Sequence, residues 1–205
     1  MSRETQKPAK QAKYHPRFQW LAIPCIQFAY QFWYGYTVTG RENIPQGGCV
    51  VCPNHNQNSD PPLAAAALGN SSRLSVMAKK ELFEMPLLWR LFTWLGGFPV
   101  DRGKADLAAI KTAMRALKDG KKLLIFPQGT RGTEADGAKE GAAMLAVKTG
   151  VPILPMYISE DKKFRRHVRI VIGEPFMPPS GTRDYAPIAD DILRRIYALR
   201  GEGGK

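Results

Sequence analysis

The stretch GCVVCPNHNQNSD, residues 48–60, begins with a short apolar, β-branched run and continues into a loop rich in polar side chains. Apolar runs of this length, bounded by Gly and Pro, are typical of buried strands. The loop carries His55 and Asp60, and two prolines directly after Asp60 keep it out of a helix interior. Ligands of open α/β sheets bind beyond the carboxyl ends of strands, so this loop is the first candidate for chemistry.

The same alternation continues along the chain. Helical spacing of Leu107, Ile110, Met114 and Leu117 after Asp106 predicts a helix that stops at Gly120. Further helices are expected at residues 138–148 and 188–199, and further strands at residues 122–126, 151–158 and 168–172. Strands separated by helices favour the α/β class, with a central mixed sheet flanked by helices.

The length, composition and net charge of the chain indicate what kind of protein it is and which kinds of partner it could bind. A chain of 205 residues indicates one domain with room for a terminal appendage, and 44% hydrophobic residues exclude a disordered chain. Thirty Lys and Arg against 18 Asp and Glu give a net charge of +12. This surplus favours an anionic partner, which could be nucleic acid, an anionic membrane or a phosphorylated small molecule.

The three cysteines argue against a disulfide framework and favour a reducing compartment. Cys49 and Cys52 have CxxC spacing, but they lie in an apolar run without a second cysteine pair or a histidine at zinc-site spacing. We therefore expect buried strand thiols and no metal site.

The N-terminal part differs from the rest of the chain. Residues 1–17 are polar and basic, and no charged residue occurs between Arg17 and Arg41, a span rich in aromatics. Glutamines and Pro24 weaken the interpretation as a transmembrane helix, so an interfacial helix over residues 18–36 is favoured. The alternatives are a transmembrane or re-entrant segment and a core helix. The predicted organisation is a basic arm and membrane-anchoring helical segment at 1–39, followed by an α/β domain at 40–205.

His55 and Asp60 could form an acid–base pair. A compact turn would bring the carboxylate to one ring nitrogen, leaving the other nitrogen to take a proton from a hydroxyl. Alternatively, Asp60 only caps the helix that begins at Pro61, and His55 only satisfies a loop hydrogen bond. The sequence has no Gly-x-Ser-x-Gly elbow, which favours direct attack by an acceptor hydroxyl over an acyl-enzyme.

Two turns carry a guanidinium group among small residues. They are FPVDRG at residues 98–103, with Arg102, and PQGTRG at residues 127–132, with Arg131. Backbone N–H groups and a bidentate cation suit phosphate, although each turn alone could simply be solvated. Neither turn has the Gly-Lys-Ser/Thr ending of a Walker loop.

Together these elements resemble a known family. HNQNSD (55–60), FPVDRG (98–103), FPQGTR (126–131) and VPILP (151–155) follow the order and spacing of the four motif blocks of the 1-acylglycerol-3-phosphate acyltransferases, in the glycerophospholipid acyltransferase superfamily. The resemblance covers about residues 40–175. It implies transfer of a fatty acyl chain from acyl-CoA or acyl carrier protein to the free hydroxyl of 1-acylglycerol-3-phosphate, giving phosphatidic acid with no further cofactor.

The resemblance also implies residue roles. His55 would be the general base and Asp60 its orienting partner. Lys79, with Lys80 as an alternative, and Gln128 would be possible contacts of the transition state or the donor. The acceptor phosphate would be held by Arg102, Gly129, Thr130 and Arg131. Gln128 stands where the family has Glu, so the amide keeps the shape of that position and loses its charge.

Several alternatives remain at this stage. The acceptor could be a lyso-ornithine lipid or a glycolipid, and Gln128 raises the alternative of a non-catalytic lipid-binding homologue. Nucleic acid is disfavoured because its recognition motifs are absent from the sequence. The basic cluster at residues 162–167 is expected to face anionic lipid or the donor's phosphates, and residues 87–95 to line an acyl groove or belong to the core. The predicted location is the cytoplasmic face of a membrane.

Overall fold

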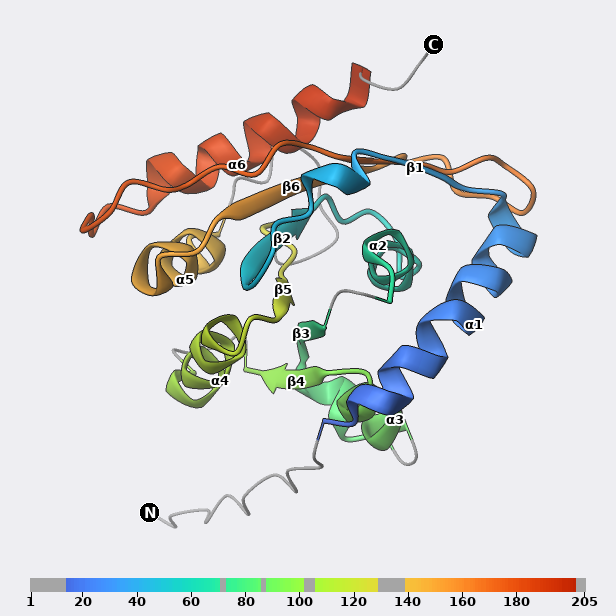
Figure 1. The fold of residues 1–205 in the computed structure, drawn as a ribbon, viewed down its shortest axis with the longest axis horizontal. Helices are drawn as coiled ribbons and strands as arrows, with labels where there is room; N and C mark the ends of the chain where they lie inside the picture. The colour runs from blue at the N-terminus through green and yellow to red at the C-terminus, as the bar shows by residue number, and fades with distance from the viewer. Residues whose placement is uncertain (1–13, 71–72, 86–87, 102–105, 129–138, 202–205) are drawn as a thin grey trace, which may run out of the picture.

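The computed structural model describes residues 14–70, 73–85, 88–101, 106–128 and 139–201. Within them lies a seven-stranded sheet in the order β1-β7-β6-β2-β5-β3-β4 (Figure 1). All neighbouring strands are parallel except the antiparallel pair β6 and β7. The strands are β1 Thr37–Thr39, β2 Cys49–Pro53, β3 Leu74–Lys79, β4 Gly97–Val100, β5 Lys122–Leu124, β6 Ile153–Ile158 and β7 Arg169–Ile172. The expected α/β class with a mixed sheet is confirmed.

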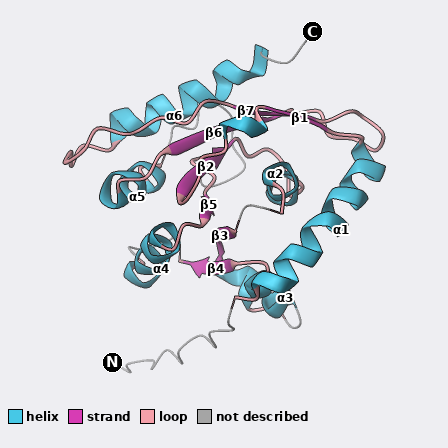
Figure 2. Ribbon diagram, in the orientation of Figure 1, coloured by secondary structure: helices cyan, strands magenta, loops and turns pink. Residues whose placement is uncertain are grey.

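Helices cover both faces of this sheet (Figure 2). Helices α4, α5 and α6 lie on one face, and α1 and α2 lie on the other. The α-helices are α1 Pro16–Tyr34, α2 Asp60–Leu68, α3 Leu88–Trp94, α4 Leu107–Lys118, α5 Gly141–Thr149 and α6 Ala186–Ala198. Short 3₁₀ helices are η1 Arg41–Asn43, η2 Lys80–Phe83 and η4 Leu199–Gly201.

Strand β2 lies at the centre of the hydrophobic core because both of its faces are covered. Val50 and Cys52 belong to the cluster beneath α4, α5 and α6, whereas Cys49 and Val51 belong to the cluster beneath α1 and α2. All four side chains are fully buried, which confirms the expected strand thiols. Burial raises the pKa of Cys49 to about 11 and raises that of Cys52 further, so both thiols stay protonated and unreactive.

Helix α1 is fastened to the sheet through a buried amide. The Nε2 group of Gln19 donates to the carbonyl oxygens of Leu74, at 3.1 Å, and Leu95, at 2.7 Å, and the Leu74 N–H donates to Gln19 Oε1. Further along the helix, Gln27 donates to the carbonyl of Ala66 in α2. Two of the glutamines that weaken a transmembrane interpretation, Gln19 and Gln27, are therefore the groups that dock this helix onto the protein.

The outer face of α1 is apolar and exposed. Its exposed large side chains are Trp20, Leu21, Phe28, Phe32 and Trp33. Within the described part of the chain, no helix combines the length and hydropathy needed to span a bilayer.

Some element boundaries differ from the sequence prediction. The predicted turn at residues 98–100 is part of β4, an edge strand that pairs with β3, where Pro99 is tolerated because one side of an edge strand needs no N–H donor. Strand β5 ends at Leu124 rather than Phe126. Helix α4 begins as predicted, with the Asp106 carboxylate accepting the Ala109 N–H at 2.9 Å.

Candidate active site

The loop between β2 and α2 is fixed at its first residue. The Asn54 side chain is fully buried and forms paired hydrogen bonds with the backbone of Ile158 at the end of β6: its Nδ2 donates to the carbonyl at 2.8 Å, and its Oδ1 accepts the N–H at 2.7 Å. Because β2 and β6 are parallel neighbours, both strands end at the same edge of the sheet. The following residue, His55, is thereby positioned at that edge.

The Asp60 carboxylate organises the rest of the loop. Its Oδ2 accepts the backbone N–H groups of Asn56 and Gln57, both at 2.7 Å, and lies 3.1 Å from His55 Nδ1. The alternative of a simple N-cap does not describe this geometry, because Ser59 occupies the N-cap position and the Asp60 carboxylate turns back onto the preceding loop. The close contact expected from the spacing of His55 and Asp60 is present.

This contact determines which ring nitrogen is available for chemistry. An ionised carboxylate only accepts hydrogen bonds, so His55 Nδ1 carries the proton and Nε2 carries the lone pair. The imidazole packs against the Phe126 ring with centroids 4.3 Å apart, and its side chain is 14% exposed. His55 therefore has its acceptor nitrogen on a ring that is held by Asp60, packed against Phe126 and only partly buried from solvent.

Lys162, which the sequence analysis predicts to face anionic lipid or the donor's phosphates, also contacts Asp60. Lys162 Nζ lies 2.9 Å from Asp60 Oδ1, and both side chains are wholly buried. The prediction that the 162–167 cluster faces lipid or donor phosphates is wrong for Lys162, because its side chain turns inward to a buried carboxylate. Lys163, Arg165 and Arg166 in the same segment are exposed.

The pKa of Asp60 is the balance of opposing effects. Burial raises the pKa of the carboxyl, but the hydrogen bonds from His55 and the Gln57 N–H, together with the Lys162 charge, outweigh burial and lower it below its usual value. The carboxylate is therefore ionised at neutral pH, as the assignment of the imidazole tautomer requires.

Gln128 connects this loop to the C-terminal helix. Its side chain is 2% exposed; Oε1 accepts the His55 backbone N–H at 3.1 Å, and Nε2 donates to the Tyr197 hydroxyl at 3.0 Å on α6. Sequence reasoning missed Tyr197, since nothing local marks a tyrosine on an amphipathic helix as a partner of a loop far away in the chain. In this geometry an amide fits both neighbours.

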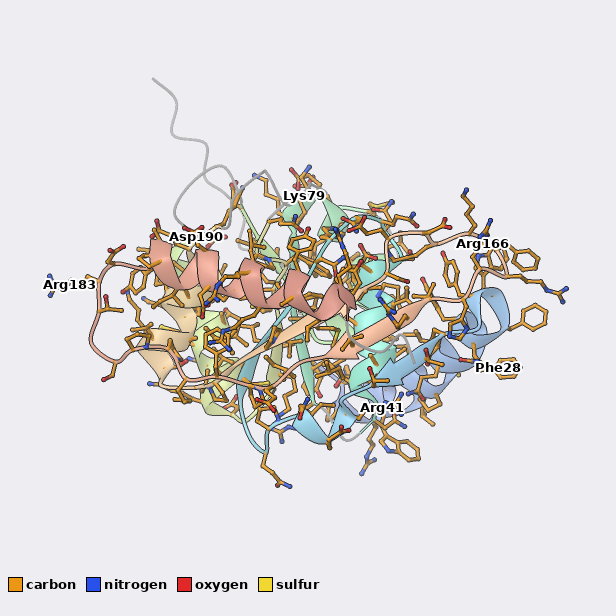
Figure 3. The ribbon with its side chains drawn as sticks, turned by 90° about the horizontal axis from the view of Figure 1, so that it is seen from above. Phe28, Arg41, Lys79, Arg166, Arg183 and Asp190 are labelled. Atoms are coloured by element: carbon orange, nitrogen blue, oxygen red, sulfur yellow. The ribbon has the colours of Figure 1, made fainter. Side chains whose placement is uncertain are left out.

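The remaining predicted residues lie partly outside the described structure. Lys79, at the end of β3, is half-exposed with Nζ 3.4 Å from Glu81 Oε1, while Lys80 pairs with Asp101 at 2.9 Å. Figure 3 shows Lys79 at the periphery of the molecule. Outside the described residues lie Arg102, Gly129, Thr130 and Arg131. Their roles, and that of Lys79, stay predictions. Among the described residues, no group of His, Cys, Asp and Glu is arranged to hold a metal ion.

The Gln128 bridge predicts a contrast between two substitutions. Gln128→Leu removes the acceptor of a buried N–H and should lower the free energy of unfolding by about 1–3 kcal/mol. Gln128→Glu should cost less, because a carboxylate can accept both the His55 N–H and the Tyr197 hydroxyl hydrogen. Urea unfolding measures both changes, with the exposed Gln31→Leu as the control; equal stability of Gln128→Leu and that control would contradict the bridge.

Known acyltransferases resemble this chain in sequence. The acyltransferase family model matches residues 35–159. The chain is 32% identical over 148 residues to a 1-acyl-sn-glycerol-3-phosphate acyltransferase of Bacillus subtilis, covering 69% of this chain and 73% of the relative. It is 33% identical over 151 residues to the Pseudomonas aeruginosa enzyme of the same name, covering 67% of this chain and 58% of that relative.

A solved structure extends the likeness to the whole fold. The crystal structure of PlsC, the 1-acyl-sn-glycerophosphate acyltransferase of Thermotoga maritima, superposes with a TM-score of 0.69 at 25% identity, covering 93% of this chain and 83% of the other. Several plant and bacterial relatives are longer, and this chain spans about half their length. The matched segment contains His55, Asp60 and Gln128, and the chain belongs to the acyltransferase family, among the 1-acylglycerol-3-phosphate acyltransferases.

Proposed function

We propose that this protein transfers a fatty acyl chain from acyl-CoA or acyl carrier protein to the free hydroxyl of 1-acylglycerol-3-phosphate, giving phosphatidic acid. The observation that carries the proposal is the His55–Asp60 contact of 3.1 Å at the carboxyl edge of the sheet. Family membership supplies the reaction class, and the names of the relatives supply the acceptor.

The geometry supports a general-base mechanism. His55 Nε2 takes the proton of the acceptor hydroxyl while the hydroxyl oxygen attacks the thioester carbonyl, and Asp60 stabilises the imidazolium that forms. The tetrahedral intermediate then collapses, the carbon–sulfur bond breaks, and the imidazolium returns its proton to the departing thiolate. No acyl-enzyme is needed, because the acceptor oxygen is itself the nucleophile.

The acceptor phosphate is proposed to bind to Arg102, Gly129, Thr130 and Arg131. Support comes from their flanking residues: Asp101 follows β4, and Gln128 contacts the His55 backbone. Gln128 lies beside the proposed general base, so a phosphate bound by the residues that follow it in the sequence would keep the hydroxyl within reach of His55. Lys79 is retained as a candidate contact for the donor or the transition state.

The apolar face of α1 is proposed to dock on the membrane that contains both lipids. Phe164, from the segment between β6 and β7, extends this face, since its ring lies 4.9 Å from that of Trp33 and is also exposed. Exposed cations flank it at Lys163, Arg165 and Arg166, and Figure 3 shows Phe28 and Arg166 at the same end of the molecule. Exposed aromatics beside cations suit the interface of an anionic bilayer.

The catalytic proposal predicts loss of transfer in His55→Ala. Purified protein, given an acyl thioester and 1-acylglycerol-3-phosphate in detergent, should release thiol and form phosphatidic acid, and the variant should be slower by about 10²–10⁴-fold. Thiol release is followed by absorbance and the lipid product by mass spectrometry. The donor and the acceptor are each varied, so that a lyso-ornithine lipid or glycolipid acceptor would be detected.

The matched control is His167→Ala, an exposed histidine hydrogen-bonded to Thr37, which should keep full activity. Full activity in His55→Ala would refute the base assignment. Lipid binding without thiol release from any donor would instead establish a non-catalytic lipid-binding protein.

The docking proposal predicts weaker vesicle binding when α1 loses exposed rings. Phe28→Ser combined with Phe32→Ser should reduce binding to phosphatidylglycerol vesicles by at least about tenfold, because burying one such ring is worth about 1.5–3 kcal/mol. Co-sedimentation with the vesicles at about 0.15 M salt measures the fraction of protein bound. Leu107→Ser removes a comparably exposed side chain from α4 and is expected to change nothing; equal binding by both variants would place the docking surface elsewhere.

A further inference from the structure

The ion pair between Lys162 and Asp60 is unusual because neither side chain touches solvent. Moving two charges out of water is costly, and a buried pair is often no more stabilising than apolar side chains of the same volume. Stability alone is therefore a weak explanation for a lysine at this position. The pair is also not an isolated structural contact, because its carboxylate is the one that holds His55.

The two oxygens of Asp60 have separate partners. Oδ2 receives the Asn56 and Gln57 N–H groups and faces His55 Nδ1, whereas Oδ1 faces Lys162 Nζ at 2.9 Å. Lys162 therefore does not compete with the imidazole for a lone pair. It acts on His55 only through the charge of the carboxylate that they share.

The segment that carries Lys162 is held at both ends. The Ser159 N–H donates to the carbonyl of Arg169, and the Arg169 N–H donates back to the Ser159 hydroxyl. At its far end, the Arg165 N–H donates to the carbonyl of Trp33 in α1 at 2.8 Å. Hydrogen bonds to β7 and to α1 thus position the segment that places Lys162 beside Asp60.

Among the described residues, the other groups near this carboxylate and its imidazole carry no charge at neutral pH. Tyr30, from α1, has its pKa raised by burial first, then by Tyr34 and by the charge of Asp60, so it stays protonated. On the β5 side, Phe126 packs on the imidazole and Gln128 contacts its backbone, and both are neutral. Within the described residues, Lys162 is the cation in contact with Asp60.

An unbalanced buried carboxylate beside an imidazole favours the imidazolium, because the charged ring would be the nearest cation to compensate it. A protonated ring cannot accept the hydroxyl proton. We propose that Lys162 is a positioning residue which, by neutralising the buried Asp60 carboxylate, keeps the His55 imidazole in its proton-accepting form at neutral pH. The catalytic consequence rests on the proposed function, whereas the effect on His55 titration does not.

The test compares neutral and charged replacements of Lys162. Lys162→Met removes the charge, Lys162→Gln removes it while leaving a hydrogen-bond donor for Oδ1, and Lys162→Arg retains it. The titration of the His55 ring is followed by NMR in protein labelled at histidine carbons, with His15→Asn and His167→Asn variants to assign the other two signals. Lys163→Met, an exposed neighbour, is the matched control.

Removing the positive charge should move the midpoint of the His55 titration to higher pH by about one unit in the Met and Gln variants. The Arg and Lys163→Met variants should leave it in place. The acidic limb of kcat/KM should move in the same direction, so the rate deficit is large at low pH and recovers as pH rises. A purely structural role would lower the rate equally at every pH.

Three outcomes are decisive. An unmoved or lower His55 midpoint in folded Lys162→Gln overturns the inference, even where Lys162→Met fails to fold. A shifted midpoint in a protein that transfers no acyl group leaves the inference standing and rejects the proposed function. Transfer activity with the same acidic limb in unaltered protein and Lys162→Gln rejects the inference and leaves the function standing.

Discussion

The site depends on one buried carboxylate. Asp60 shapes the loop after β2 by accepting the N–H groups of Asn56 and Gln57, fixes the imidazole of His55, and neutralises a lysine from a distant segment. A buried carboxylate stays ionised only if such partners outweigh the loss of water, and here they do. The ionised Asp60 carboxylate thus accounts for three features: the shape of the local backbone, the tautomer of His55 and the placement of Lys162.

The parallel sheet brings the residues of the site together, because parallel strands end at the same edge. Strands β2, β5 and β6 are parallel, so Asn54, Gln128 and the segment carrying Lys162 all emerge at the same edge. Paired hydrogen bonds between Asn54 and Ile158 join the ends of β2 and β6 there, and Gln128 bridges the His55 backbone to Tyr197 in α6. Helix α1 packs on one face of the sheet through Gln19. This docking leaves the aromatic side of α1 exposed to solvent.

The sequence predicts those features of the structure that depend on residues close together in the chain. The central strand, the helix capped by Asp106 and the closeness of His55 to Asp60 all follow from residues within a few positions of each other. Partners distant in the chain could not be predicted this way. Lys162 looks like any other member of a basic cluster, Tyr197 like any helical tyrosine, and Gln19 like a polar interruption, until tertiary contacts give each a specific partner. Strand β4 was missed because Pro99 signals a turn unless the strand lies at an edge.

The position of the proton on the neutral His55 ring can be read by ¹⁵N NMR of the imidazole at alkaline pH. The contact with Asp60 predicts the tautomer with hydrogen on Nδ1 and a pyridine-like Nε2 that can accept a proton. In Asp60→Asn this preference should weaken, because the amide no longer presents two acceptor oxygens. A neutral ring with its hydrogen on Nε2 in the unaltered protein would rule out the proposed role of His55, since the nitrogen proposed to accept the hydroxyl proton would then carry no lone pair.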